Sequence, residues 1–154
     1  MSNNRAQILI VDDEAMNRTV LSDLLSDEYD IIEAKDGDEA ILILENSATE
    51  ITLVLLDMMM PGCNGIEVLN IMNQKGWIKG TPVIMISAET SSVQVAKAFS
   101  LGVTDFIYRP FDQMVVQNRV RNTIQLYVKQ MQLSELVSNK IYERTRNRDR
   151  KSVV

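Results

Sequence analysis

The chain has 154 residues, of which 45% are hydrophobic, and this suits one globular domain with a buried core and an appendage. Its formal net charge of −5 gives no general attraction to nucleic acid or to an anionic membrane, so we expect direct contact with neither. Histidine is absent, which excludes histidine-containing triads, histidine-ligated zinc and a phosphohistidine relay within the chain.

The sequence also carries no sign of export. Its one cysteine, Cys63, cannot form an internal disulfide, and we assign it no role. The first five residues lack the apolar stretch of a signal peptide, and no apolar run approaches the roughly 20 residues that span a bilayer. We therefore expect a cytoplasmic protein.

Strands and helices alternate along the chain. The apolar run Gln7–Val11 stops at two aspartates, as a strand buried on both faces does, and apolar residues then recur at helical spacing from Met16 to Leu25. The same alternation predicts strands at 31–32, 53–56, 82–86 and 106–108, and helices at 38–44, 66–72, 93–101 and from Asp112 onward. Strands joined by helical crossovers imply a parallel sheet, so we predict a doubly wound, flavodoxin-like α/β fold with five strands, five helices and an extended last helix.

Polar residues follow four of the predicted strands. These are Asp12, Asp13 and Glu14 after the first, Asp57 after the third, Ser87 after the fourth and Arg109 after the fifth. In a doubly wound sheet they converge at the carboxyl edge. Neighbouring carboxylates repel each other by about 3 kcal/mol per pair at an effective dielectric of about 20, so a cation is expected among them. Oxygen ligands without histidine or thiolate favour magnesium.

Each of these residues has an ordinary structural interpretation. A pair of aspartates after a strand is more often solvated than functional, Ser87 alone is usually a structural hydroxyl, and Arg109 alone is usually a surface charge. Asp57 differs, because a carboxylate at the end of a buried strand is costly without a partner. Ser87 and Arg109 would supply the hydroxyl and the fixed positive charge that a transferred phosphoryl group needs. Their placement after successive strands favours a functional site.

The spaced set resembles the receiver domain of bacterial two-component response regulators over about residues 6 to 127. The matching segments are Asp12-Asp13, Asp57-Met58-Met59-Met60-Pro61 with Gly65, Ser87-Ala88 and Arg109-Pro110-Phe111. The resemblance implies that Asp57 accepts a phosphoryl group from a partner histidine kinase or phosphotransfer protein. It also implies that Asp13, Asp57 and the backbone carbonyl of Met59 bind Mg²⁺ directly, while Asp12 assists through water.

The same resemblance implies a signalling switch rather than an enzyme. Ser87 would bond the phosphoryl group, Ala88 would leave room for it, and Phe106 would then rotate inward and remodel the surface beside it. An ordinary core phenylalanine is the alternative interpretation of Phe106. The family usually has lysine where this chain has Arg109, so we expect phosphorylation to persist and the coupling to the switch to differ.

A function of another class is a magnesium-dependent phosphohydrolase in which Asp57 is a nucleophile that water regenerates. Such an enzyme usually needs a second acid or base and a capping element, and the sequence shows no insertion that would supply one. A nucleotide-binding module is disfavoured, because no G-x-G-x-x-G follows the first strand. The switch is therefore the preferred prediction.

The last helix is expected to outgrow the domain. A seam-like stripe at Val116, Val120, Ile124, Tyr127 and Met131 breaks at Ser134 and Ser138 and resumes, displaced, at Leu133, Val137 and Ile141. We predict a receiver domain at 1–127, and at 128–154 a helical extension or a linker to an output domain absent from this sequence. The part beyond Val128 needs a partner helix, which a homodimer would supply, or loses order.

The charged segment 144–151 is expected to be a frayed end or linker. A weaker resemblance to receivers that precede HD or GGDEF modules suggests an output in cyclic-nucleotide turnover.

Overall fold

The structure, a computed structural model, describes residues 5–88 and 91–152, with only the backbone described for 149–152. Its elements follow one another in the expected alternation. They are β1 (Gln7–Val11), α1 (Ala15–Leu25), β2 (Asp30–Ala34), α2 (Gly37–Ser47), β3 (Ile51–Asp57), α3 (Gly65–Gln74), the short 3₁₀ helix η1 (Trp77–Lys79), β4 (Val83–Ser87), α4 (Ser92–Ser100), β5 (Asp105–Tyr108) and α5 (Gln113–Ser152).

The strands form one parallel sheet in the order β2-β1-β3-β4-β5. Strand order reverses at β1, which lies between β2 and β3 and pairs Val11 with Ala34 on one side and with Leu56 on the other. Ligands of doubly wound sheets bind beyond the carboxyl ends of the strands at such a reversal. The fold therefore confirms the predicted class and places the aspartates at the expected edge.

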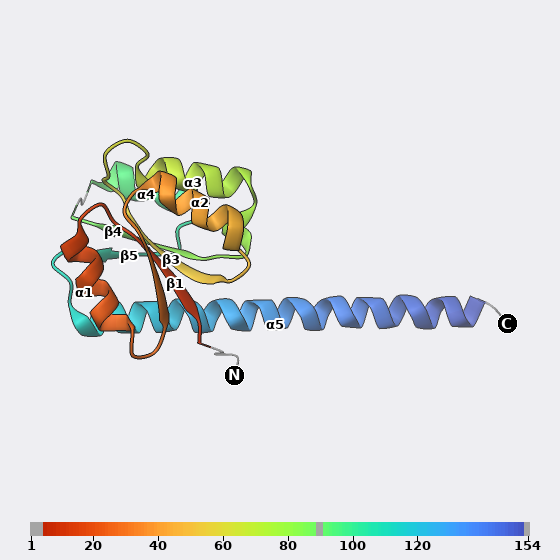
Figure 1. Ribbon diagram of the computed structural model, residues 1–154. Coiled ribbons are helices and arrows are strands. Elements are labelled where there is room, and N and C mark those ends of the chain that lie inside the picture. Colours follow the sequence, from red (N-terminus) through yellow and green to blue (C-terminus); the bar gives the residue numbers. More distant parts are fainter. Residues whose placement is uncertain (1–4, 89–90, 153–154) are drawn as a thin grey trace.

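Helices cover both faces of the sheet (Figure 1). Helices α2, α3 and α4 bury residues such as Leu44, Leu69 and Ala98 on one face, while α1 and α5 bury Leu21 and Val120 on the other. Because both faces are covered, β1, β3 and β4 are almost continuously apolar. The polar side chains at their carboxyl ends are thus the exceptions in an apolar layer.

The observed bounds of most elements differ from the predicted ones by one to three residues, and three further points concern the site and the chain's end. Strands β3 and β4 continue through Asp57 and Ser87, so these two functional candidates are the last residues of strands rather than loop residues. The turn η1 was not predicted, because three residues are too few to show a period. For the segment 144–151 the sequence left a helical extension, a frayed end and a linker open, and the α5 backbone is helical through it to Ser152, which excludes the frayed end and is in keeping with the high helix propensity of arginine and lysine.

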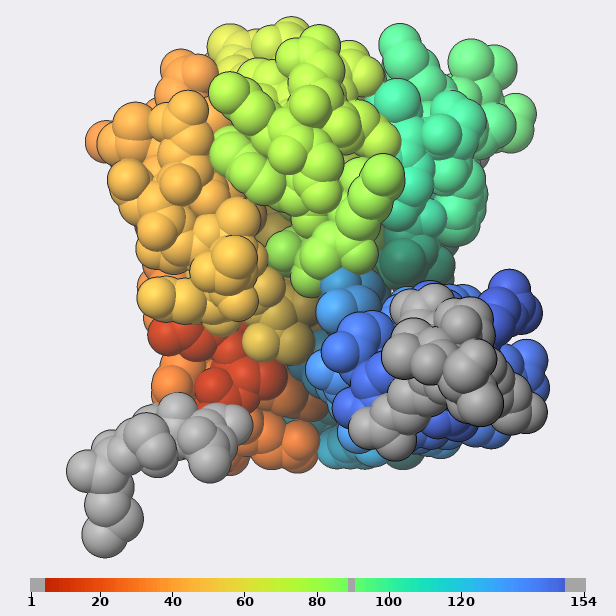
Figure 2. Space-filling view, turned by 90° about the vertical axis from the view of Figure 1, so that its right-hand side faces the viewer, coloured from red at the N-terminus to blue at the C-terminus, as the bar shows by residue number. Residues whose placement is uncertain are grey.

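The 40-residue α5 is the dominant feature of the outline (Figure 1). Its first turns pack on the sheet, where Val116 and Val120 are fully buried. The Tyr127 hydroxyl donates a 2.9 Å hydrogen bond to the Lys79 carbonyl at the edge of the domain. Beyond this point the helix stands clear of the body, and its end faces the viewer in Figure 2. None of the described helices combines the length and the apolar character needed to cross a membrane.

Candidate functional site

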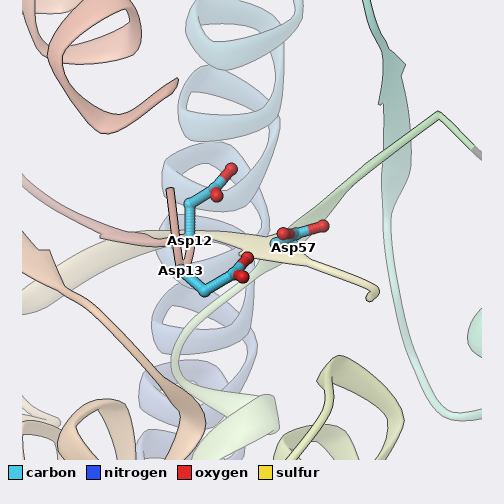
Figure 3. A group of neighbouring side chains, drawn as sticks. All are labelled: Asp12, Asp13 and Asp57. Carbon is cyan, nitrogen blue, oxygen red and sulfur yellow. The ribbon is translucent and has the colours of Figure 1, made fainter. Parts of the chain in front are cut away.

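Three carboxylates meet at the carboxyl edge of the sheet (Figure 3). Asp12 and Asp13 directly follow β1, and Asp57 ends the neighbouring strand β3. One oxygen from each of the three lies within 4.8 Å of the others, while Asp12 and Asp57 are buried and Asp13 is exposed. The structure thus brings together the carboxylates that the sequence predicted, with two of them in a poorly solvated place.

Local turns hold the two buried carboxylates by one oxygen each. Asp12 Oδ1 accepts a 2.9 Å hydrogen bond from the backbone N–H of Glu14. Asp57 Oδ1 likewise accepts a bond of 3.3 Å from the N–H of Met59. The fully buried Asp12 is also fixed through its backbone, since its carbonyl accepts a 2.7 Å bond from Arg18. Each carboxylate is therefore oriented with its second oxygen available to a cation.

Arg109 provides that cation within the chain. Its Nη2 donates to Asp12 Oδ2 at 2.7 Å and lies 3.1 Å from Asp57 Oδ2. Its Nε is buried and has no hydrogen-bond partner among the described residues. The peptide bond that joins Arg109 to Pro110 is cis. Arg109 is thus a member of the site, as the sequence suggested, but its contacts in this structure are with the carboxylates.

The electrostatics follow from burial and crowding. Burial, together with the nearby charge of Asp12, raises the pKa of Asp57 to about 6, although Arg109 acts in the opposite direction. Burial also disfavours the charged guanidinium, but the Asp57 and Asp12 carboxylates outweigh it and raise the pKa of Arg109. One guanidinium therefore compensates the two buried carboxylates only in part, and a further cation would be favourable there.

Ser87 and Met59 stand where the sequence predicted them. Ser87 is the last residue of β4 and is fully buried, with its Oγ 4.0 Å from the Met58 sulfur. Met59 exposes its side chain to solvent, and its backbone adjoins Asp57. Ala88, which follows Ser87, is exposed. The phosphoryl contact of Ser87 and the metal contact of the Met59 carbonyl stay predictions.

Phe106 is buried in the structure. The residue is 3% exposed, and its ring contacts those of Phe99 and Tyr108, with distances of 5.2 Å and 6.0 Å between ring centroids. Arg119 on α5 donates a hydrogen bond to the Phe106 carbonyl and lies 3.9 Å from Asp105. Phe106 is thus buried in this structure, and its expected rotation stays a prediction.

Two supporting residues escaped the sequence reasoning. Arg18 contacts the backbone of Asp12 and pairs with Glu33 at 3.2 Å, and its position on the helix after Asp12 was the only available signal. Gly65 was noted only as part of a motif, but the structure explains it. A Cβ at this position would lie 2.5 Å from the Asp57 carbonyl oxygen and 2.9 Å from Met58 Cα, so only glycine lets α3 begin against the end of β3.

The donor set fits a magnesium ion. All three carboxylates supply hard oxygen atoms, and Mg²⁺ is typically held by one or two carboxylates while it keeps several waters. The exposed Asp13 leaves the site open to solvent on one side, as such partial hydration requires. Asp12, Asp13 and Asp57 are therefore suitable residues for an Mg²⁺ site.

Comparison with known proteins identifies the family. A family model described as "Response regulator receiver domain" matches residues 8–121, which is most of the chain. The chain belongs to this family. It is 41% identical over 119 residues to the transcriptional regulatory protein ResD of Bacillus subtilis, a match that covers 77% of this chain and 48% of ResD. The chain spans about half the length of the curated relatives it matches.

Solved structures agree. The receiver resembles a chain of the CheX-CheY-BeF3-Mg+2 complex from Borrelia burgdorferi, with a TM-score of 0.70, 36% identity and coverage of 77% of this chain and 88% of that one. It also resembles a putative two-component system response regulator/GGDEF domain protein, with a TM-score of 0.74, 27% identity and coverage of 81% and 51%. Membership in the family supports a phosphoryl-accepting signalling switch and does not favour the phosphohydrolase alternative.

Proposed function

We propose that this receiver is a cytoplasmic switch that accepts one phosphoryl group on Asp57 from a phosphohistidine of a partner histidine kinase or phosphotransfer protein. The observation that carries the proposal is the position of Asp57. Its carboxylate ends a buried strand, next to Asp12 and Asp13 and 3.1 Å from the Arg109 guanidinium. Because this sequence contains no histidine, the phosphohistidine donor has to lie outside residues 1–154.

The transfer forms one bond and breaks one. A carboxylate oxygen of Asp57 attacks phosphorus, the phosphorus–nitrogen bond of the phosphohistidine breaks, and its electron pair stays on the imidazole nitrogen. The turn at Met59 holds Oδ1 of Asp57 and thereby orients the carboxylate. Arg109 offsets the negative charge that gathers around the acceptor, and the Ser87 hydroxyl provides a hydrogen bond to a phosphoryl oxygen.

We assign magnesium to Asp13, Asp57 and the backbone carbonyl of Met59, with Asp12 acting through water. When bound, Mg²⁺ would neutralise the carboxylates and the phosphoryl oxygens together. The crowding of two buried carboxylates and an exposed one supports this assignment.

We further propose that residues 1–127 form the receiver and that 128–154 connect it to an output. The fold supports this division, because the Tyr127–Lys79 hydrogen bond lies at the edge of the domain. Residues 1–4 and 153–154 lie outside the described residues. The likeness to a response regulator/GGDEF protein supports an output in cyclic-nucleotide turnover.

Arg109 would set how strongly phosphorylation is coupled to Ser87 and Phe106, because its planar guanidinium differs from a lysine ammonium.

The test is the formation of a covalent phosphate. Incubation with acetyl phosphate and Mg²⁺ should add one phosphoryl group, detected as an increase in intact mass, and the Asp57→Asn variant should not acquire it. Asp23→Asn, which alters an exposed residue of α1, is the matched control and should be phosphorylated like the wild type. An unchanged adduct in Asp57→Asn would remove Asp57 from the proposed role. Rapid multiple turnover without a lasting adduct would instead support the phosphohydrolase.

A further inference from the structure

From the edge of the domain outward, α5 carries an apolar strip that the rest of the described chain leaves largely exposed. We define the strip as Leu126, Leu133, Leu136 and Val137, which are each 56–64% exposed. Leu126, Leu133 and Val137 follow one another by seven and four residues, so they share a face of the helix, and Leu136 flanks them. A long helix with such a face is not stable alone in water, because most helical stability comes from packing an apolar face.

The charge of the chain is divided between its two parts. Residues 1–127 contain 9 Lys and Arg against 18 Asp and Glu, a net charge of −9, whereas residues 128–154 contain 7 against 3, a net charge of +4. The two totals give the −5 of the whole chain. The positive charge is concentrated at the end of α5, where Arg144 and Arg148 continue the face of the apolar strip by the same spacing of seven and four.

We propose that the strip binds a second copy of this chain, with the two α5 helices antiparallel, so that the basic end of each lies against the acidic body of the other. A parallel pair would place two +4 ends side by side and two −9 bodies side by side. Like charges brought together oppose association and opposite charges direct it, so the charge pattern selects the antiparallel orientation. The proposal does not depend on phosphorylation of Asp57.

The area of the strip points the same way. Burial of its four side chains in both copies would remove roughly 600 Å² of apolar surface, which is about half of the smallest stable interfaces. The contact therefore has to extend beyond the strip. An antiparallel helix provides this extension, since its last turns lie along the partner's domain rather than in solvent.

The register follows from the strip. If the helices cross with Leu133 opposite Val137, then Arg144 lies opposite Leu126, and Arg148 lies opposite Asn122. Leu126 and Asn122 both line a hollow of about 260 Å³ between α5 and the sheet, together with Asp105. Asp105 is partly exposed and is 3.9 Å from its intrachain partner Arg119. The hollow thus offers space and an acidic group where the geometry brings Arg148 of the second copy.

Oligomeric state is the first test, measured by sedimentation velocity on the full chain. The wild type should associate to a dimer, and Leu133→Ser combined with Leu136→Ser should raise the dissociation constant at least tenfold. Tyr142→Ser is the matched control, because Tyr142 is 66% exposed but lies on the opposite face of α5. Arg144→Glu with Arg148→Glu should also weaken the dimer, whereas Arg146→Glu, which faces away from the strip, should not.

Orientation is the second test. In a Cys63→Ser background, a spin label on Asn147→Cys should give an intermolecular distance of about 35 Å in the antiparallel dimer, because 1.5 Å per residue accumulates on both sides of the crossing. A parallel dimer would place the labels about 10–20 Å apart, and that result would overturn the proposal. A monomer at every concentration, or equal weakening by the strip variants and their controls, would overturn it as well.

Discussion

A single nitrogen of Arg109 lies 3.1 Å from the carboxylate of Asp57, although 52 positions separate the two residues along the chain. The same nitrogen also donates to Asp12, so one guanidinium holds both buried carboxylates. The charge that the sequence suggested for a phosphoryl group is already engaged in the site. Removal of this guanidinium, its replacement by a lysine ammonium and the binding of Mg²⁺ beside it should therefore have distinct consequences.

Arg109→Ala should lower the free energy of unfolding in the absence of Mg²⁺ by on the order of 2 kcal/mol, because two buried carboxylates lose their cation. Arg109→Lys should lower the free energy of unfolding by less than Arg109→Ala does, because lysine keeps the positive charge although it lacks the planar guanidinium. Saturating Mg²⁺ should reduce the deficit of Arg109→Ala. Urea unfolding with and without Mg²⁺ measures these differences. Stability of Arg109→Ala equal to that of the wild type without Mg²⁺ would show that the contacts carry no net energy.

Phosphorylation separates the roles of Arg109 further. We expect Arg109→Lys to be phosphorylated by acetyl phosphate at nearly the wild-type rate but to respond differently at Phe106, because charge survives while geometry changes. The measurements are the rate of adduct formation, by intact mass, and the change in the aromatic NMR signals of Phe106 on addition of beryllofluoride. Identical spectral changes in wild type and Arg109→Lys would mean that the guanidinium has no special part in the coupling.

Asp57→Asn should stabilise the Mg²⁺-free protein above pH 6. A carboxyl group with a raised pKa binds its proton more tightly in the folded state, so it lowers the free energy of unfolding as the pH rises from about 4 through about 6. Asparagine does not titrate, so the variant should keep the free energy of unfolding that the wild type loses over this pH range, on the order of 2 kcal/mol. Urea unfolding of both proteins at pH 4.5 and 7.5 gives the comparison. A gain that is as large at pH 4.5 as at pH 7.5 would contradict the assignment to Asp57.

Asp13→Asn should weaken Mg²⁺ binding by about tenfold or more with little change in stability, since Asp13 is exposed and contributes mainly a ligand oxygen. Calorimetric titration with Mg²⁺ measures the affinity, and thermal unfolding measures the stability. Asp38→Asn, another exposed aspartate outside the site, serves as the control. Equal Mg²⁺ affinity in the two variants would place the ion elsewhere.

Gly65→Ala should be destabilising by on the order of 2 kcal/mol and should slow phosphorylation. Alanine normally favours a helix over glycine by about 1 kcal/mol, but here its Cβ would press on the backbone of Asp57 and Met58. Gly80→Ala is the control, because its Cβ would meet only ordinary contacts at 3.8 and 3.9 Å. A Gly65→Ala protein as stable as Gly80→Ala would show that the end of β3 can shift freely.

The sequence was sufficient to predict the order of strands and helices and the edge at which Asp12, Asp13 and Asp57 meet, because apolar periodicity and strand ends are local signals. It did not predict that Arg109 bridges two of these carboxylates, since that contact depends on the direction of a long side chain. The sequence also left the state of 144–151 open between a helical extension and a frayed end or linker, because a charged segment without apolar residues shows no period. The close approach of Gly65 to Asp57 depends on packing between α3 and β3, which no spacing encodes.

Helix α5 begins shortly after Arg109 at the carboxyl edge, crosses the face of the sheet and leaves near the start of β3, where Tyr127 and Thr52 line one hollow. It therefore runs the full depth of the domain before it projects outward. With 40 residues it is about 60 Å long, so a tilt of about 5° at its first turn would displace its far end by about 5 Å. A helix of this length would therefore convert a small tilt inside the domain into a displacement of several ångströms at its far end.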